Sequence, residues 1–126
     1  MVTAIEKMKK FLKGFVYAWR GIVAAVRSER NMKFHAVVAL CVVVAGFVLQ
    51  ISPMEWAAVL LCCGLVISAE MVNTAIEKLC DVVEPNLNEK IRAIKDIAAG
   101  AVLVCAIAAA CVGVIVFLPK IIELFA

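Results

Sequence analysis

The sequence predicts an all-α integral membrane protein, with one amphipathic surface helix followed by three transmembrane helices. Hydrophobic residues make up 66% of its 126 residues, whereas a soluble domain contains about 45–50%. Three separate apolar segments are each long enough to cross a bilayer. Helices are expected because they satisfy their own backbone hydrogen bonds in lipid. A chain of this length fits one domain, residues 1–126, with no separate soluble catalytic domain.

The basic residues indicate how the chain is oriented. Of the 13 basic residues, eight lie within residues 1–33, four lie between the second and third apolar segments, and one follows the third. Positive charge stays on the cytoplasmic side of a membrane. We therefore expect a multi-pass protein of the plasma membrane, with a cytoplasmic N-terminus, a cytoplasmic loop over residues 81–95 and an outer C-terminus.

Residues 4–27 have the pattern of an amphipathic helix. Their apolar residues form one stripe of about 100° on a helical wheel, with basic residues opposite. A helix of this kind lies in the headgroup plane. Tyr17 falls among the polar residues, and Trp19 is placed as an interfacial anchor. The stripe consists of Ile5, Met8, Leu12, Phe15, Trp19, Ile22 and Val26.

Two apolar segments follow, at residues 34–51 and at about residues 54–80. The first would reach about 27 Å as a helix, just enough for a bilayer core. Ser52-Pro53 is expected to separate the two spans in a very short outer turn. Pro85 is expected to break the second helix within the cytoplasmic loop.

A further helix is predicted to begin near Glu89 and to contain the third span, residues 97–118. This span is uncharged over its whole length of about 33 Å, which makes it the clearest of the three. Its many alanines and glycines would let helix backbones approach closely. Pro119-Lys120 is expected to end the helix.

The second span carries a line of polar residues at its cytoplasmic end. Glu70, Asn73, Glu77 and Asp81 recur every three or four residues, so they share one narrow helix face. A carboxylate near a bilayer centre costs roughly 2.5 kcal/mol or more, so Glu70 needs a partner or a chemical role. Carboxylates at this level suit Mg²⁺, which takes oxygen ligands together with water and substrate phosphates.

The topology brings other polar residues to the same membrane level, and each has an ordinary structural alternative. An acidic side chain at this level could simply be solvated among the lipid headgroups. An adjacent acid and base could form a charge pair that stabilises the start of a helix. Glu70 could be protonated and donate a hydrogen bond to another helix. His35 is expected to be an interfacial polar residue. Spacing alone predicts a cytoplasm-facing polar site in a helical membrane oligomer, because further copies would shelter these groups. The other residues concerned are Glu29, Glu77, Asp81, Lys95 and Asp96.

Motifs over nearly the whole chain resemble the bacterial diacylglycerol kinase family of small, three-span lipid kinases. The E-x-x-N-[ST]-A-x-E pattern at residues 70–77 precedes Asp81 and the Lys95-Asp96 pair. Residues 17–21 and 28–31 extend the resemblance toward the N-terminus. Residues 28–35 together with Glu55-Trp56 and residues 117–120 are similar to the Gram-positive branch, whose members resemble undecaprenol kinases.

This resemblance implies a reaction. The expected activity is ATP-dependent phosphorylation of a membrane lipid alcohol, undecaprenol to undecaprenyl phosphate, and the alternative is diacylglycerol to phosphatidic acid. Glu70 would be the catalytic base, with Asn73 beside the reacting groups. Glu29 and Glu77 would coordinate Mg²⁺ with the nucleotide. A third possibility, an ion-conducting or structural oligomer, has no continuous polar path through the spans to support it.

The resemblance also implies substrate contacts and an assembly. The family is homotrimeric, with sites shared between protomers in the bacterial cell membrane, and no nucleic acid is expected as a partner. Lys10 replaces the family's arginine and so loses the bidentate fork, and Ala99 stands where some members have serine. The expected lipid contacts are Trp19, Glu70 and Ala99. The remaining nucleotide contacts are Lys10, Tyr17, Asn86, Leu87, Asn88, Lys95 and Asp96.

Overall fold

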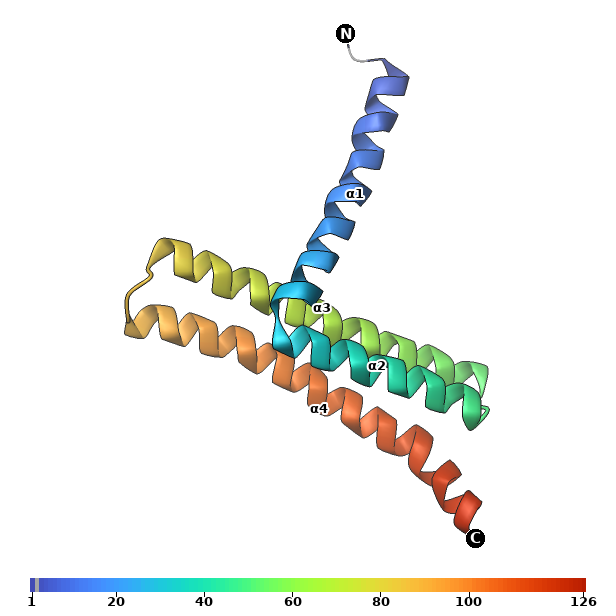
Figure 1. Ribbon diagram of the computed structural model, residues 1–126. Helices are drawn as coiled ribbons and strands as arrows, with labels where there is room; N and C mark the ends of the chain where they lie inside the picture. Colours follow the sequence, from blue (N-terminus) through green and yellow to red (C-terminus); the bar gives the residue numbers. More distant parts are fainter. Residues whose placement is uncertain (2) are drawn as a thin grey trace.

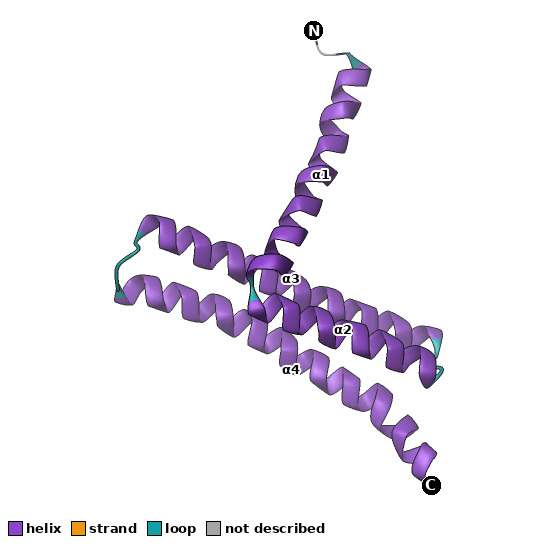
Figure 2. Cartoon of the chain, in the orientation of Figure 1, coloured by secondary structure: helices purple, strands orange, loops and turns teal. Residues whose placement is uncertain are grey.

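The protein consists of four helices, seen in a computed structural model that describes Met1 and residues 3–126. Helices α2, α3 and α4 pack side by side in alternating directions, and α1 projects away from this bundle (Figure 1). Short loops join the helices, and the described residues contain no strand (Figure 2). The helices are α1 (Ala4–Ser28), α2 (Arg30–Val48), α3 (Pro53–Val83) and α4 (Glu89–Phe125).

The all-α prediction with three spans is confirmed at this level. In the described part of the chain, α2, α3 and α4 are long and apolar enough to cross a membrane. The amphipathic segment predicted at residues 4–27 is helix α1, which ends one residue later at Ser28.

Local capping explains where two of the helices begin. The Thr3 hydroxyl accepts a hydrogen bond from the Glu6 backbone at 3.2 Å, and the Glu6 carboxylate accepts one from the Thr3 backbone at 2.9 Å. Ser52 and Glu55 repeat this reciprocal arrangement at the start of α3. Pro53 follows the cap, where its missing N–H costs nothing.

The outer end of the bundle packs closely around the turn between α2 and α3. A Cβ atom added to Gly46 would lie 2.6 Å from the Trp56 ring, so glycine is needed for this approach. Ile51 of this turn, Val59 of α3 and Val116 of α4 form a small buried apolar cluster, and Val42 of α2 packs against it. This cluster fixes the three spanning helices to one another at the end of the bundle far from α1.

The length of α3 carries its polar end out of the apolar layer. Its 31 residues extend about 46 Å at 1.5 Å per residue, whereas the bilayer core is about 30 Å thick. The corner between α1 and α2 lies against α3 and away from the start of that helix (Figure 1). There Lys78 Nζ donates a hydrogen bond to Ser28 Oγ at 3.3 Å. The polar face of α3 therefore lies where α1 leaves the bundle.

Helix α4 continues beyond its proline. It runs through Pro119 to Phe125, so the prediction that Pro119-Lys120 ends the helix is wrong. Proline removes one backbone hydrogen bond, but such a break is tolerated in a spanning helix where neighbouring groups compensate. Lys120 Nζ lies 3.2 Å from Glu55 Oε1, and this ion pair ties the segment to the start of α3.

Candidate functional site

Three polar side chains on one face of α3 are buried. Glu70, Asn73 and Thr74 are only 3%, 5% and 5% exposed, and Glu77 is half-buried one turn farther along. Asn73 Nδ2 donates a hydrogen bond to Glu77 Oε1 at 3.2 Å. All four residues of the predicted face, Glu70, Asn73, Glu77 and Asp81, lie on α3. Asn73 and Glu77 are in direct contact, whereas Asp81 is exposed.

Two buried polar atoms on this face have no hydrogen-bond partner among the described residues, Asn73 Oδ1 and Thr74 Oγ1. Leaving such an atom unsatisfied costs about 1–3 kcal/mol, so this patch is suited to a ligand, a water molecule or a neighbouring subunit. Thr74 was not among the predicted site residues. Its position four residues after Glu70, on the same face, was a signal that could have identified it.

The partner of Glu70 comes from α2. His35 Nε2 lies 3.6 Å from Glu70 Oε2, and the two side chains are 17% and 5% exposed. The sequence predicted His35 as an interfacial polar residue, so its approach to the buried carboxylate was missed. The signal available was its place near the start of a span, at the membrane level of Glu70.

The predicted metal ligands lie on different elements. Glu29 is half-buried at the corner between α1 and α2, next to Ser28, which bonds to Lys78 of α3. Glu77 lies on α3 beside Asn73. Nowhere among the described residues are three or more His, Cys, Asp or Glu side chains grouped so that they could hold a metal ion. The Ser28–Lys78 hydrogen bond joins the chain neighbours of Glu29 and Glu77, so the two carboxylates belong to the same region of the fold.

An ion pair joins the cytoplasmic ends of α3 and α4. Lys95 Nζ lies 2.6 Å from Asp81 Oδ1, and this hydrogen bond raises the pKa of Lys95, which precedes the third span. Lys95 therefore stays protonated, as a group that neutralises phosphate should. Asp96, in contrast, is exposed.

The predicted nucleotide loop is exposed and includes a helix cap. Asn86, Leu87 and Asn88 follow the end of α3. Asn88 Oδ1 accepts hydrogen bonds from the backbone of Lys90 and Ile91, at 2.9 and 3.3 Å. Asn88 is the N-cap of α4, a structural role that its place just before the predicted helix start indicated.

The remaining predicted contacts are not brought to the polar face within one chain. Lys10, Tyr17 and Trp19 are exposed on α1, which projects away from the bundle (Figure 1). The Arg20 guanidinium lies 5.8 Å from the centre of the Tyr17 ring. Ala99 is exposed on α4.

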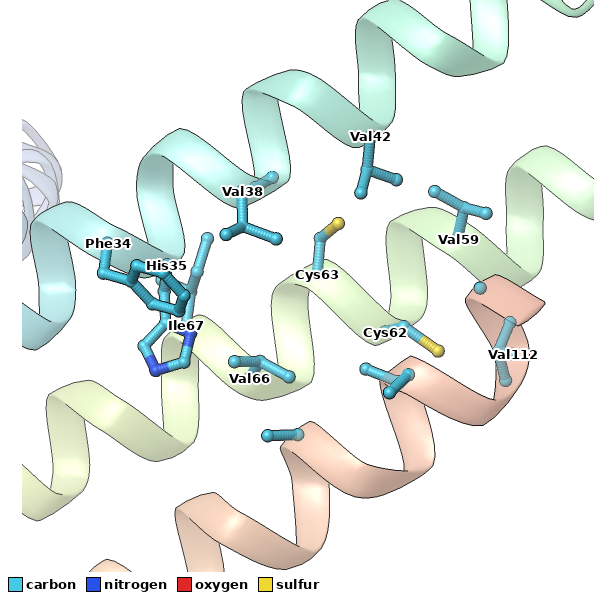
Figure 3. A pocket seen from close by; sticks show the side chains of 15 residues that line it. Phe34, His35, Val38, Val42, Val59, Cys62, Cys63, Val66, Ile67 and Val112 are labelled. Atoms are coloured by element: carbon cyan, nitrogen blue, oxygen red, sulfur yellow. The ribbon is translucent and has the colours of Figure 1, made fainter. Parts of the chain in front are cut away.

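An apolar cavity of about 290 Å³ lies between α2, α3 and α4. Apart from His35 and the thiols of Cys62 and Cys63, its lining is entirely apolar. The labelled side chains around it include Val38, Val42, Val66 and Val112, with His35 at one end (Figure 3). One end of the cavity is therefore formed by the residue that contacts Glu70.

Comparison with known proteins agrees with this architecture. Residues 16–117 match the family model described as prokaryotic diacylglycerol kinase. The chain is 41% identical over 116 residues to the undecaprenol kinase of Bacillus subtilis, covering 92% of this chain and 94% of that protein. It is 37% identical over 114 residues to the diacylglycerol kinase of Synechocystis sp., covering 90% of this chain and 65% of that protein. The chain therefore belongs to the prokaryotic diacylglycerol kinase family and is a lipid kinase.

Proposed function

We propose that the protein transfers phosphate from ATP to undecaprenol, with Glu70 as the general base. The observation that carries this proposal is a buried carboxylate beside the polar end of an apolar cavity. A lipid chain lying in the cavity would present its terminal hydroxyl next to His35 and Glu70. The similarity to the Bacillus subtilis undecaprenol kinase supports the same substrate.

The proposed reaction needs positioning and charge neutralisation more than covalent catalysis. The lipid oxygen forms a bond to the γ-phosphorus of ATP, the bond from that phosphorus to the bridging oxygen breaks, and ADP leaves. Glu70 accepts the proton that the hydroxyl gives up. Glu70 is only 3% exposed, and the cavity would bring the hydroxyl to it from the membrane side.

The composition of the cavity favours a polyprenol over diacylglycerol. Diacylglycerol carries two ester groups near its hydroxyl, and polar groups lose free energy when they are buried without hydrogen bonds. The lining offers only His35 and two thiols to such groups. A polyprenol has a single polar group, its hydroxyl, and its hydrocarbon chain matches the apolar walls.

The residues at the α3 face fit a magnesium ion. Asn73 Oδ1 is buried without a partner among the described residues, and Glu29 and Glu77 offer carboxylate oxygens nearby in the fold. Magnesium is usually held by one or two carboxylates, with waters and phosphate oxygens completing its shell. When bound, it would offset the charge of the triphosphate. Glu29 and Glu77 would hold the ion, and Asn73 Oδ1 would be available to accept a hydrogen bond beside it.

The nucleotide contacts proposed for this chain require more than one protomer. Lys95 and Asp96 would contact ATP from α4 together with residues 86–88, and Lys10 and Tyr17 would contact it from α1. Because α1 projects from its own bundle, we propose a homotrimer in which α1 of one protomer serves the site of a neighbour. The N-terminus and residues 81–95 would face the cytoplasm and the C-terminus would lie outside.

The test is phosphate transfer from labelled ATP by the purified protein with Mg²⁺, with undecaprenol and diacylglycerol offered in parallel micelles. Faster transfer to undecaprenol is expected. A preference for diacylglycerol would retain the catalytic residues but change the lipid, as the Synechocystis relative's name suggests. Absence of transfer to either lipid would contradict the proposed function.

A further inference from the structure

The cavity and the buried carboxylate meet at one side chain, His35. It is the only histidine in the chain, and it comes from the second turn of α2, whereas Glu70 comes from α3. Its ring lies at the end of the cavity near Phe34 and Ile67 (Figure 3). The rings of Phe34 and His35 pack edge to face at 5.6 Å.

The contact with Glu70 is long but correctly placed. The distance of 3.6 Å between His35 Nε2 and Glu70 Oε2 is slightly beyond a direct hydrogen bond. Catalytic hydrogen bonds are often long in the absence of substrate and shorten in the reactive complex. Both side chains are largely buried, and a shortening of a few tenths of an ångström would bring the two atoms within hydrogen-bond distance.

No side chain in the described part of the protein makes a direct hydrogen bond to the Glu70 carboxylate, and His35 is the polar side chain that comes nearest to doing so. A catalytic base is commonly oriented by a third group, which leaves the reacting atom in a defined position. A donor on one carboxylate oxygen would leave the other oxygen for the lipid hydroxyl. Among the described residues, His35 is the one that combines a polar side-chain contact with Glu70 and a place in the cavity wall.

We propose that His35 is a positioning residue, whose Nε2–H holds one oxygen of Glu70 while the cavity delivers the lipid hydroxyl to the other. This inference rests on the proposed role of Glu70 as the base. It also requires that the residue at position 35, between the cavity and the carboxylate, donate a hydrogen bond to Glu70 of α3.

Two substitutions separate the hydrogen bond from simple packing. His35→Leu fills the space without a donor and is expected to lower kcat about 10- to 100-fold, the usual effect of losing a supporting contact, with KM for ATP unchanged. His35→Gln restores an N–H donor and is expected to recover most of the lost rate. Lys33→Gln changes an exposed residue on the same helix and should behave as wild type.

A spectroscopic measurement tests the contact without relying on activity. With ¹⁵N-labelled histidine, the protein gives imidazole signals from one residue, because it has a single histidine. Glu70→Gln is expected to move the Nε2 resonance at fixed pH, and Lys33→Gln is expected to leave it in place. An unmoved Nε2 resonance in Glu70→Gln would overturn the contact, whether or not the His35 variants fold.

Two kinetic outcomes would also overturn the positioning role. One is a His35→Leu protein with wild-type kcat, and the other is an equal loss in folded His35→Leu and His35→Gln, which would indicate packing alone. Both comparisons use wild-type activity as their reference. If the wild-type protein transferred no phosphate to lipid, the proposed function would fail, whereas the resonance measurement would still test the His35–Glu70 contact.

Discussion

At the scale of single residues, α3 buries polar side chains that its own chain does not fully satisfy. Asn73 uses its amide N–H₂ on Glu77 but leaves its oxygen without a partner among the described residues, as does the Thr74 hydroxyl. Glu70 is buried with only a long contact to His35. Unsatisfied buried groups are costly, and in a membrane protein polar residues at such depth mark functional positions.

Glu77 offers a direct test of the proposed metal role. Glu77→Gln removes the negative charge and keeps an oxygen that can accept the hydrogen bond from Asn73 Nδ2, so the local fold should persist. The Mg²⁺ concentration that gives half-maximal transfer is expected to rise about tenfold or more, because lost metal contacts weaken binding by such factors. Transfer is measured against Mg²⁺ concentration at saturating ATP.

The control for this variant is Glu123→Gln, which neutralises an exposed carboxylate near the end of α4. It should leave the Mg²⁺ dependence unchanged. An unaltered Mg²⁺ requirement in Glu77→Gln would remove this residue from the metal site.

At the scale of helices, sequence signals predicted the boundaries well where local chemistry decides them. Ser52-Pro53 begins α3 through a reciprocal cap, and Pro85 follows its end at Val83. The end of α4 was not predictable from Pro119 alone. Whether a proline ends a spanning helix depends on contacts made across the bundle, here the pair between Lys120 and Glu55.

Asn88 has a helix-capping role that can be separated from nucleotide binding. Asn88→Ala removes the side-chain oxygen that accepts from Lys90 and Ile91 and should destabilise the protein by about 1 kcal/mol. Asn88→Ser keeps a capping oxygen and should retain most of the stability. Thermal unfolding in detergent compares the two variants.

The same two variants test the proposed nucleotide contact. If the amide of Asn88 contacts ATP, both substitutions raise KM for ATP, although only alanine lowers stability. Equal stability of Asn88→Ala and wild type would show that the cap is dispensable.

At the scale of the whole molecule, one chain holds only part of the predicted site. The polar face of α3, the cavity and the Lys95–Asp81 pair belong to the bundle, whereas Tyr17 and Trp19 lie on the projecting α1. Spacing predicted the shared face of Glu70, Asn73, Glu77 and Asp81, because a helix has a fixed period. The approach of His35 depends on how α2 packs against α3, which local sequence does not determine.

Mixing two inactive variants tests whether sites are shared between protomers. Glu70→Gln alters the bundle and Tyr17→Ala alters α1, and each purified alone is expected to have little activity. If α1 of one protomer serves a neighbour's site, mixed oligomers assembled from both variants contain some intact sites and recover transfer. Recovery is measured after dissociation and reassembly in detergent.

The control for mixing is each variant taken through the same reassembly alone. No recovery in fully mixed oligomers would contradict shared sites and would place Tyr17 and Glu70 in the same protomer's site.

The central claim is that Glu70 takes the proton from the lipid hydroxyl, and the most direct measurement is the kcat of Glu70→Gln for phosphate transfer to undecaprenol. The substitution is nearly isosteric, so helical content and oligomer size should match wild type. A loss of at least about 100-fold in kcat is expected, the usual minimum for removing a general base. A folded Glu70→Gln protein with near-wild-type kcat would contradict the account.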